Sequence, residues 1–115
     1  MTVTIYHNPR CSKSRQTLAL LQERGMAPTV VEYLNTPPNA ETLQGILVQL
    51  GMAPRDLMRT QEDAYRAAQL DNAALSEEDL VNAMVNNPVL IERPIVIANG
   101  KAAIGRPPEN ILSIL

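Results

Sequence analysis

The residues with the clearest chemical potential lie in one short stretch near the N-terminus, which holds the only cysteine of the chain. The stretch reads His7-Asn8-Pro9-Arg10-Cys11-Ser12-Lys13-Ser14-Arg15. The thiolate is the reactive form of cysteine, and neighbouring positive charge lowers a cysteine pKa from about 8.5 into the range of roughly 3.5 to 7.5. Arg10, Lys13 and Arg15 supply such charge. We therefore interpret Cys11 as a nucleophile in an anion pocket, and the alternative is an inert buried cysteine.

The surrounding pattern predicts that Cys11 lies between a strand and a helix. Residues 2–6 alternate polar and β-favouring side chains, as a strand does, and a turn follows. A helix is expected from about residue 14 to 24, with Ser12 and Ser14 as capping residues. The first N–H groups of a helix lack partners and its dipole is positive there, so both a thiolate and a bound oxyanion are favoured at this place.

Composition limits the classes of protein that the chain can represent. Its 115 residues suffice for one domain with one core. The chain is 45% hydrophobic but has no Trp, no Phe and three Tyr, so the core must be aliphatic. A net charge of −2 argues against a general nucleic-acid binder, which would need a basic face.

The counts of cysteine and histidine exclude several further kinds of site. A single cysteine cannot form an internal disulfide, and one Cys with one His makes no recognisable metal ligand set. One cysteine, with no evident signal peptide and no membrane-spanning apolar run, leads us to expect a reducing cytoplasm. We also expect a monomer without a tightly bound cofactor. If Cys11 is oxidised during turnover, the second thiol must come from another molecule.

The next part of the chain predicts a second strand and then a helix. Residues 29–34 are rich in β-branched side chains. A strand, helix and strand of this length normally form a right-handed parallel crossover. Beyond Asn39, which suits a helix N-cap, apolar residues recur at helical spacing and Gly51 ends the pattern. The residues of this apolar stripe are Leu43, Ile46, Leu47 and Leu50.

Three shorter helices are expected after this one. Pro54 suits a first helical position, while Thr60 and Ser76 each begin a sequence that resembles a capping box. Acidic residues cluster in the first turns of these helices, where capping accounts for them without a catalytic role. We therefore predict a helical insert over about residues 39–87, within a single domain over residues 1–115.

The last third of the chain returns to strands. Ile95–Ala98 and Lys101–Ile104 flank Asn99-Gly100, which is a strong hairpin signal because both turn residues must tolerate a positive φ. Pro107-Pro108 then opens a final helix, with one apolar side to pack on the sheet.

The order of these elements suggests a thioredoxin-like α/β fold: a mixed four-stranded sheet with the helical insertion between its second and third strands. Pro94 precedes the third strand and is a candidate for a cis proline that faces the cysteine turn and holds Arg93 beside Cys11; the sequence does not determine the isomer. Ser14 stands where a dithiol redox protein would have its second cysteine, so dithiol chemistry within this chain is excluded.

Three arginines at loop ends are candidates for binding an anion beside Cys11. Arg59 follows a short predicted helix, Arg93 precedes Pro94, and Arg106 follows the hairpin. In a thioredoxin-like sheet these loop ends could converge, and their planar guanidinium groups suit a tetrahedral oxyanion. Alternatively, each is a surface arginine in an ordinary ion pair.

These motifs together resemble the glutaredoxin-coupled arsenate reductase family, in particular its shorter members. The resemblance is carried by Ile5-Tyr6-His7-Asn8-Pro9-Arg10-Cys11-Ser12-Lys13-Ser14-Arg15, by Tyr33-Leu34-Asn35-Thr36-Pro37-Pro38 and by Arg93-Pro94-Ile95-Val96. It runs from the first strand to the final helix and implies a thioredoxin-like fold.

The resemblance also implies an activity and roles for individual residues. Cys11 would attack arsenate, Arg59, Arg93 and Arg106 would bind the arsenic oxyanion, and glutathione and glutaredoxin would supply the reducing electrons. In the family, the residue that matches His7 helps to keep the thiolate and the residue that matches Ser14 can hydrogen-bond it. From the residues alone, His7 is either a cation that supports the thiolate or a strand-end residue satisfied by the backbone.

The basic residues next to the cysteine have a separate expected role. Arg10 and Lys13 would attract the anionic substrate or an acidic glutathione, and Arg15 would support the thiolate.

Two other functions remain open at this point. One is a monothiol oxidoreductase or transferase that acts on glutathione adducts. The other is a non-enzymatic regulator that resembles the Spx-type members of the fold and binds a protein such as RNA polymerase. The redox switch of such regulators usually needs two cysteines, and Ser14 takes the place of the second.

Overall fold

The computed structural model describes residues 2–115, and the chain divides into two compact units. The first unit contains the chain up to Thr36 and again Arg93–Leu115, and the second is Pro37–Glu92. The second unit includes the segment for which the sequence predicts a helical insert, about 39–87. The assignment of both units to one domain over residues 1–115 stays a prediction.

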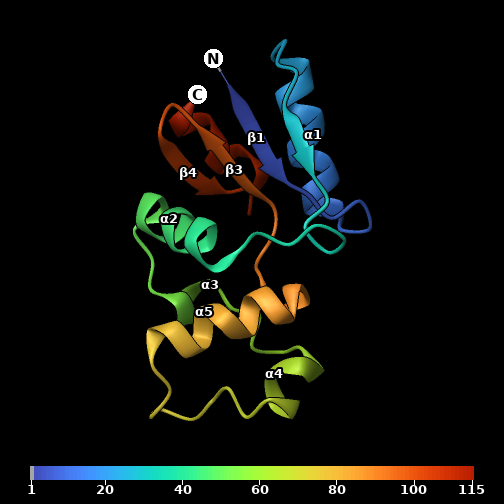
Figure 1. The fold of residues 1–115 in the computed structure, drawn as a ribbon. Helices are drawn as coiled ribbons and strands as arrows, with labels where there is room; N and C mark the ends of the chain where they lie inside the picture. The colour runs from blue at the N-terminus through green and yellow to red at the C-terminus, as the bar shows by residue number, and fades with distance from the viewer. Residues whose placement is uncertain (1) are drawn as a thin grey trace. The chain divides into compact units, whose positions relative to one another are not determined.

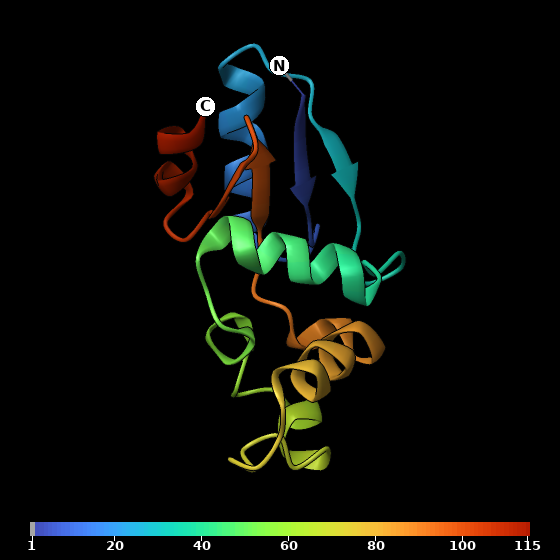
Figure 2. The ribbon, with the colours of Figure 1, turned by 60° about the vertical axis from the view of Figure 1, so that its left-hand side comes forward.

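The first unit is built on the predicted mixed four-stranded sheet, which is confirmed (Figure 1). The strands are β1 (Val3–Tyr6), β2 (Thr29–Val31), β3 (Ile95–Ala98) and β4 (Lys101–Ile104), in the order β2-β1-β3-β4. β1 is parallel to β2, whereas β3 is antiparallel to both β1 and β4. Figure 2 shows β2, β1 and β3 side by side.

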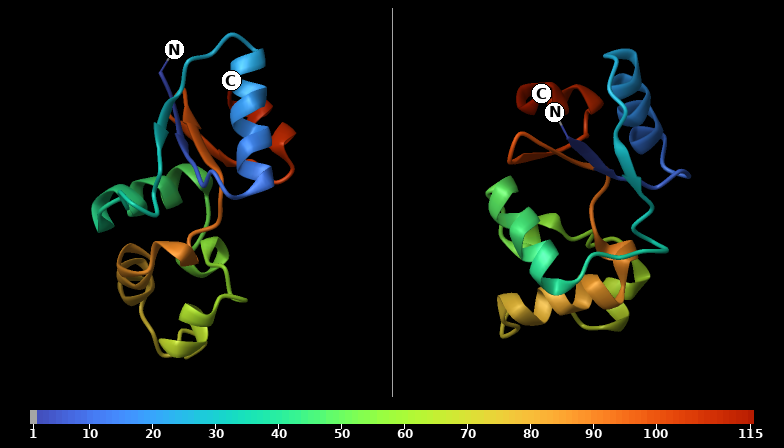
Figure 3. Two further views of the ribbon diagram at one scale, coloured as in Figure 1. Left: turned by 90° about the vertical axis from the view of Figure 1, so that its right-hand side faces the viewer. Right: turned by 45° about the horizontal axis from the view of Figure 1, so that its top comes forward.

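Two helices cover one face of this sheet. They are α1 (Ser12–Glu23) and the 3₁₀ helix η2 (Pro108–Ile114), and Figure 3 shows both on the same side of the strands. Between them and the sheet lies an aliphatic core, as the composition predicts. Its buried members are Val3, Ile5, Leu21, Val96, Ala98, Ile111 and Ile114.

Three local predictions for the first unit need correction or refinement, and a fourth is confirmed. α1 begins at Ser12, so its N-cap is Cys11, which makes no side-chain capping bond. β2 ends at Val31 rather than near residue 34, because the N–H groups of Asn35 and Thr36 both turn back to the carbonyl of Glu32. The final helix is 3₁₀. The hairpin is confirmed, with φ of 55° at Asn99 and 72° at Gly100.

The second unit is helical. Its elements are α2 (Ala40–Leu50), α3 (Pro54–Leu57), α4 (Asp63–Ala67), α5 (Glu77–Asn86) and the 3₁₀ helix η1 (Pro88–Leu90). Apolar side chains from these elements are buried, as the helical spacing predicts. They include Leu43, Ile46, Leu47, Leu57, Leu80, Val81, Met84 and Leu90.

Most of the predicted helix boundaries in this unit are confirmed by their caps. Asn39 caps α2 by accepting the N–H of Thr42 at 2.8 Å, and Gly51 ends it with φ of 68°. Ser76 caps α5 through a capping box. The prediction at Thr60 is wrong, because α4 begins only at Asp63 and no side chain caps it.

Candidate active site

The sheet register brings three chain segments to one edge of the first unit. β1 ends at Tyr6, which pairs with Ile95 at the start of β3, and Ile95 pairs with Ile104 at the end of β4. The segments that follow β1, precede β3 and follow β4 therefore meet at this edge. They carry Cys11, Arg93 and Arg106.

Cys11 is a free, partly exposed cysteine at the start of α1. Its own N–H donates to the carbonyl of Asn8 at 3.0 Å, which fixes the turn before the helix. Partial burial raises the pKa of the Cys11 thiol, but this is outweighed by the N–H of Ser14, the hydrogen bond and charge of Arg93, and the N–H of Lys13. The net effect lowers the pKa of Cys11, as expected for sulfur at a positively polarised helix start.

The second guanidinium beside the sulfur belongs to Arg106. Its Nη1 atom lies 3.7 Å from Cys11 Sγ and donates to the carbonyl oxygen of Arg93 at 3.3 Å. The Arg93-Pro94 bond is cis, and so is Arg106-Pro107. Two of the three predicted arginines are therefore adjacent to the cysteine.

His7 and Ser14 form a buried pair beneath the cysteine turn. His7 Nδ1 and Ser14 Oγ are 2.6 Å apart, and Ser14 Oγ also accepts the N–H of Asn8 at 3.0 Å. The predicted capping role of the Ser14 hydroxyl is thus wrong, because this hydroxyl is occupied on the preceding turn. Ser14 acts on Cys11 through its backbone N–H.

The charge state of His7 follows from its surroundings. It is only 6% exposed, and burial lowers its pKa; the charge of Glu32 opposes this change and that of Arg15 adds to it. The neutral imidazole is therefore favoured. Arg15 itself donates from Nη1 to the carbonyl of Pro9 at 2.9 Å, so it braces the turn.

Arg59 belongs to the helical unit. Its Nε and Nη1 atoms form ion pairs with Glu62 and Glu92, at 3.0 and 2.9 Å. Burial lowers the pKa of Arg59, but the two carboxylates prevail and raise it, so the guanidinium stays charged. Its part in an anion site stays a prediction.

A cavity of about 390 Å³ lies beside the cysteine turn. Arg10 lines it and is exposed, and its expected role in attracting an anion stays a prediction. The other residues around the cavity are His7, Asn8, Pro9, Glu32, Leu34 and Asn35.

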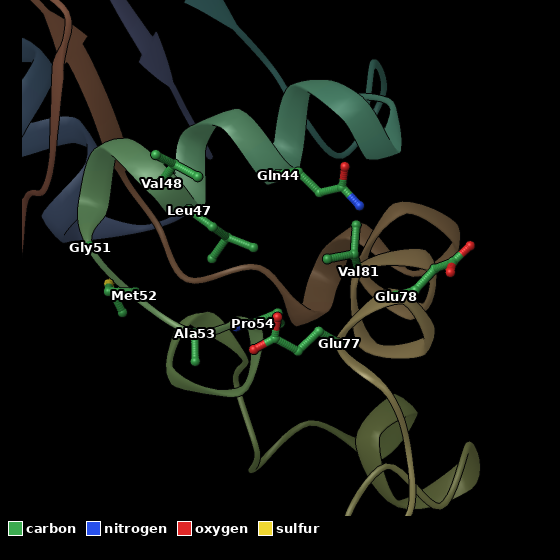
Figure 4. Close-up of a pocket in the computed structure, with 10 residues that line it drawn as sticks. All are labelled: Gln44, Leu47, Val48, Gly51, Met52, Ala53, Pro54, Glu77, Glu78 and Val81. Carbon is green, nitrogen blue, oxygen red and sulfur yellow. The ribbon is translucent and has the colours of Figure 1, made fainter.

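The helical unit holds a cavity of about 500 Å³ that offers different chemistry (Figure 4). Leu47 on α2 and Val81 on α5 point toward each other across it, and Glu77 borders it. Its lining has no cysteine or histidine, so it offers no thiolate or imidazole. Within residues 2–115, no group of three or more His, Cys, Asp or Glu side chains is arranged to hold a metal ion.

Sequence reasoning missed two residues next to the site, Thr17 and Gly105. Thr17 is a fully buried polar residue of α1, and its hydroxyl lies 3.4 Å from the carbonyl oxygen of Gly105. The available sequence signal was a glycine directly before Arg106 and outside the hairpin turn. The structure shows that this glycine is not needed for a positive φ.

Comparison with known proteins decides the family. The family model described as the ArsC family matches residues 6–114. The chain belongs to the ArsC family. A relative from Neisseria meningitidis serogroup A, named arsenate reductase, is 53% identical over 98% of this chain and 97% of its own length. YfgD of Escherichia coli K12, named as an uncharacterized protein, is 60% identical over 98% of this chain and 96% of its own length.

A solved structure agrees with the fold of this ArsC-family chain. The arsenate reductase from Vibrio cholerae is 52% identical, with a TM-score of 0.98 over 100% of this chain and 98% of that one. The predicted thioredoxin-like α/β fold is thereby confirmed. Among the residues described, no helix is both long and apolar enough to cross a membrane.

Proposed function

We propose that this ArsC-family protein reduces arsenate to arsenite through Cys11, with glutathione and glutaredoxin as external reductants. The observation that supports this most directly is the sulfur of Cys11, which has a lowered pKa and lies against the guanidinium groups of Arg93 and Arg106. A charged nucleophile with two cationic donor forks beside it suits attack on a tetrahedral oxyanion. The relatives named arsenate reductase point to the same substrate.

In the first step, the Cys11 thiolate attacks arsenic(V) and forms an S–As bond. One As–O bond breaks, and its oxygen leaves as water with protons taken from solvent. Arg93 and Arg106 donate hydrogen bonds to the remaining oxygens and stabilise their charge in the transition state. Arginine suits this role because its fork of donors stays charged throughout.

In the second step, the thiolate of glutathione attacks the sulfur of the Cys11 adduct. The S–As bond breaks and its electron pair stays on arsenic, which becomes arsenic(III) and leaves as arsenite. Cys11 is left as a mixed disulfide with glutathione. Glutaredoxin then attacks the glutathione sulfur and releases the Cys11 thiolate, so the electrons come from thiols outside this chain. A reducing cytoplasm supplies both partners, and the protein acts there as a monomer.

Arg59 has a separate part in this proposal. Its guanidinium is held by Glu62 and Glu92, so an incoming arsenate would have to compete with two carboxylates for its donors. We assign it to initial binding of the anion. Arg59→Ala should then raise KM for arsenate, while the exposed Arg66→Ala should leave it unchanged.

The test is consumption of NADPH in a mixture of the protein, glutathione, glutaredoxin and glutathione reductase, with and without arsenate. Wild type should consume NADPH only with arsenate, and Cys11→Ser should abolish the signal. Arg93→Ala or Arg106→Ala should lower kcat/KM by about 10²-fold, as loss of one oxyanion donor does. Wild type without arsenate dependence would reject the proposal. Turnover of a glutathionylated peptide in the same mixture would indicate a transferase, and stable binding of a large partner without turnover a regulator.

A further inference from the structure

Thr17 occupies an unusual place for a hydroxyl. Its side chain is fully buried in α1, one turn beyond Lys13. The Thr17 hydroxyl donates to the carbonyl of Lys13 at 2.8 Å and lies 3.4 Å from the carbonyl oxygen of Gly105. A buried hydroxyl is stable only with such partners, so Thr17 links the first turns of α1 to the segment after β4.

Gly105 approaches this hydroxyl more closely than any other residue type could. A Cβ atom at position 105 would lie 2.4 Å from Thr17 Oγ1 and 2.8 Å from Pro94 Cγ, both too short for real contacts. On its other side, the N–H of Gly105 donates to the carbonyl of Pro94 at 2.9 Å. Gly105 is therefore clamped between α1 and the loop that carries Arg93.

The contact between Thr17 and Gly105 is connected to the groups that act on the Cys11 sulfur. Lys13, whose N–H supports the Cys11 thiolate, is bonded to Thr17, and Arg106 follows Gly105 in the chain. The helix start and the Arg106 guanidinium approach Cys11 from separate segments, so their separation is set by how closely those segments pack. Thr17 and Gly105 form the close contact between these two segments.

We propose that Thr17 and Gly105 are positioning residues for Cys11: they hold α1 and the Arg106 segment at the separation at which both act on one sulfur. The inference rests on the proposed function for its effect on turnover. Its effect on the thiolate needs no substrate. A misplacement of about 1 Å is enough to cost on the order of 10²-fold in rate.

Two substitutions test this from the two sides of the contact. Gly105→Ala introduces the clashing Cβ, and Thr17→Val replaces the hydroxyl with a methyl group of similar size. Both should shift the pH profile of Cys11 alkylation by iodoacetamide toward higher pH and lower kcat/KM for arsenate by tenfold or more. Thr17→Ser keeps the hydroxyl and should retain the wild-type pH profile.

Two controls separate positioning from a general loss of structure. Gly45→Ala in α2, where the added Cβ would meet nothing within 4 Å beyond its chain neighbours and its own helix backbone, should change neither readout. Partial unfolding would reduce the active fraction without moving the pH profile. If Gly105→Ala does not fold, the alkylation pH profiles of Thr17→Val and Thr17→Ser are compared, and a shift in Thr17→Val alone supports the inference. Folded variants with unshifted alkylation profiles would overturn the inference, whereas missing arsenate turnover in wild type would overturn only the proposed function.

Discussion

The Nη1 atom of Arg106 lies 3.7 Å from the Sγ atom of Cys11, although 95 positions separate the two residues in the chain. A fixed cation at this distance favours the thiolate over the thiol. We expect Arg106→Ala to raise the pKa of Cys11, so that the midpoint of its alkylation by iodoacetamide moves to higher pH. Arg106→Lys keeps the charge but not the planar fork and should give a smaller shift.

The exposed Arg24, at the far end of α1, provides a matched control for this experiment. Arg24→Ala removes the same charge from the chain but no contact to the sulfur, so the alkylation midpoint should stay where it is. An equal shift in Arg24→Ala and Arg106→Ala would mean that net charge, rather than the observed contact, controls the thiol.

Arg93 allows a prediction about pH dependence. Its hydrogen bond and charge lower the pKa of Cys11, so wild type should react at lower pH than an ordinary thiol does. Arg93→Ala should raise this pKa and move the acidic limb of the arsenate kcat/KM profile to higher pH. The profile is measured in the coupled assay with saturating glutaredoxin. If the acidic limb does not move in Arg93→Ala, it reflects the titration of a group other than Cys11.

The Ser14 hydroxyl is expected to contribute substantially to the free energy of unfolding. It satisfies the buried N–H of Asn8 and pairs with the ring of His7, and Ser14 is 0% exposed. Ser14→Ala should lower the free energy of unfolding by about 1–3 kcal/mol, because buried polar groups lose their partner. Ser12→Ala is the control, since Ser12 is exposed in the same helical turn. Urea unfolding of the two variants compares them, and equal losses would refute the role assigned to Ser14.

The lowered pKa of His7 predicts how stability responds to acid. The unfolded imidazole takes up a proton near its ordinary pKa of about 6.5, whereas the folded one does so only at lower pH. Stability from His7 is thus fully present above pH 6.5 and is lost as pH falls below it. Between pH 7.5 and 5.5, wild type should lose more unfolding free energy than His7→Gln, in which that group cannot titrate.

Local chemistry made much of the fold predictable from the sequence. Asn99-Gly100 specifies a hairpin by its need for positive φ, and Gly51 ends a helix for the same reason. The location of Cys11 at a helix start followed from the order of strand, turn and helix. Such features depend on a few neighbouring residues, so sequence reasoning can find them.

Features that depend on tertiary contacts were not predictable in the same way. Serine is a common helix-capping residue, but the Ser14 hydroxyl instead pairs with His7 and accepts the N–H of Asn8, both of which precede the helix. In the sequence Gly105 looks like an ordinary loop glycine. Only the structure shows its contact with Thr17, which lies 88 positions earlier in the chain. Arg93 and Arg106 meet at Cys11 because the strands pair in one register, which no local pattern encodes.

The two predicted capping boxes in the helical unit, at Ser76 and Thr60, lead to different expectations for stability. Ser76 Oγ accepts the N–H of Asp79 at 3.0 Å and the Asp79 carboxylate accepts the N–H of Ser76 at 3.0 Å, whereas α4 starts beyond Thr60. Ser76→Ala should therefore lower the free energy of unfolding by about 0.5–2 kcal/mol, the usual cost of losing an N-cap. Thr60→Ala, at an exposed position without a capping bond, should change it by less than about 0.5 kcal/mol. Urea denaturation of both variants measures the difference, and a larger loss in Thr60→Ala would mean that α4 begins earlier than Asp63.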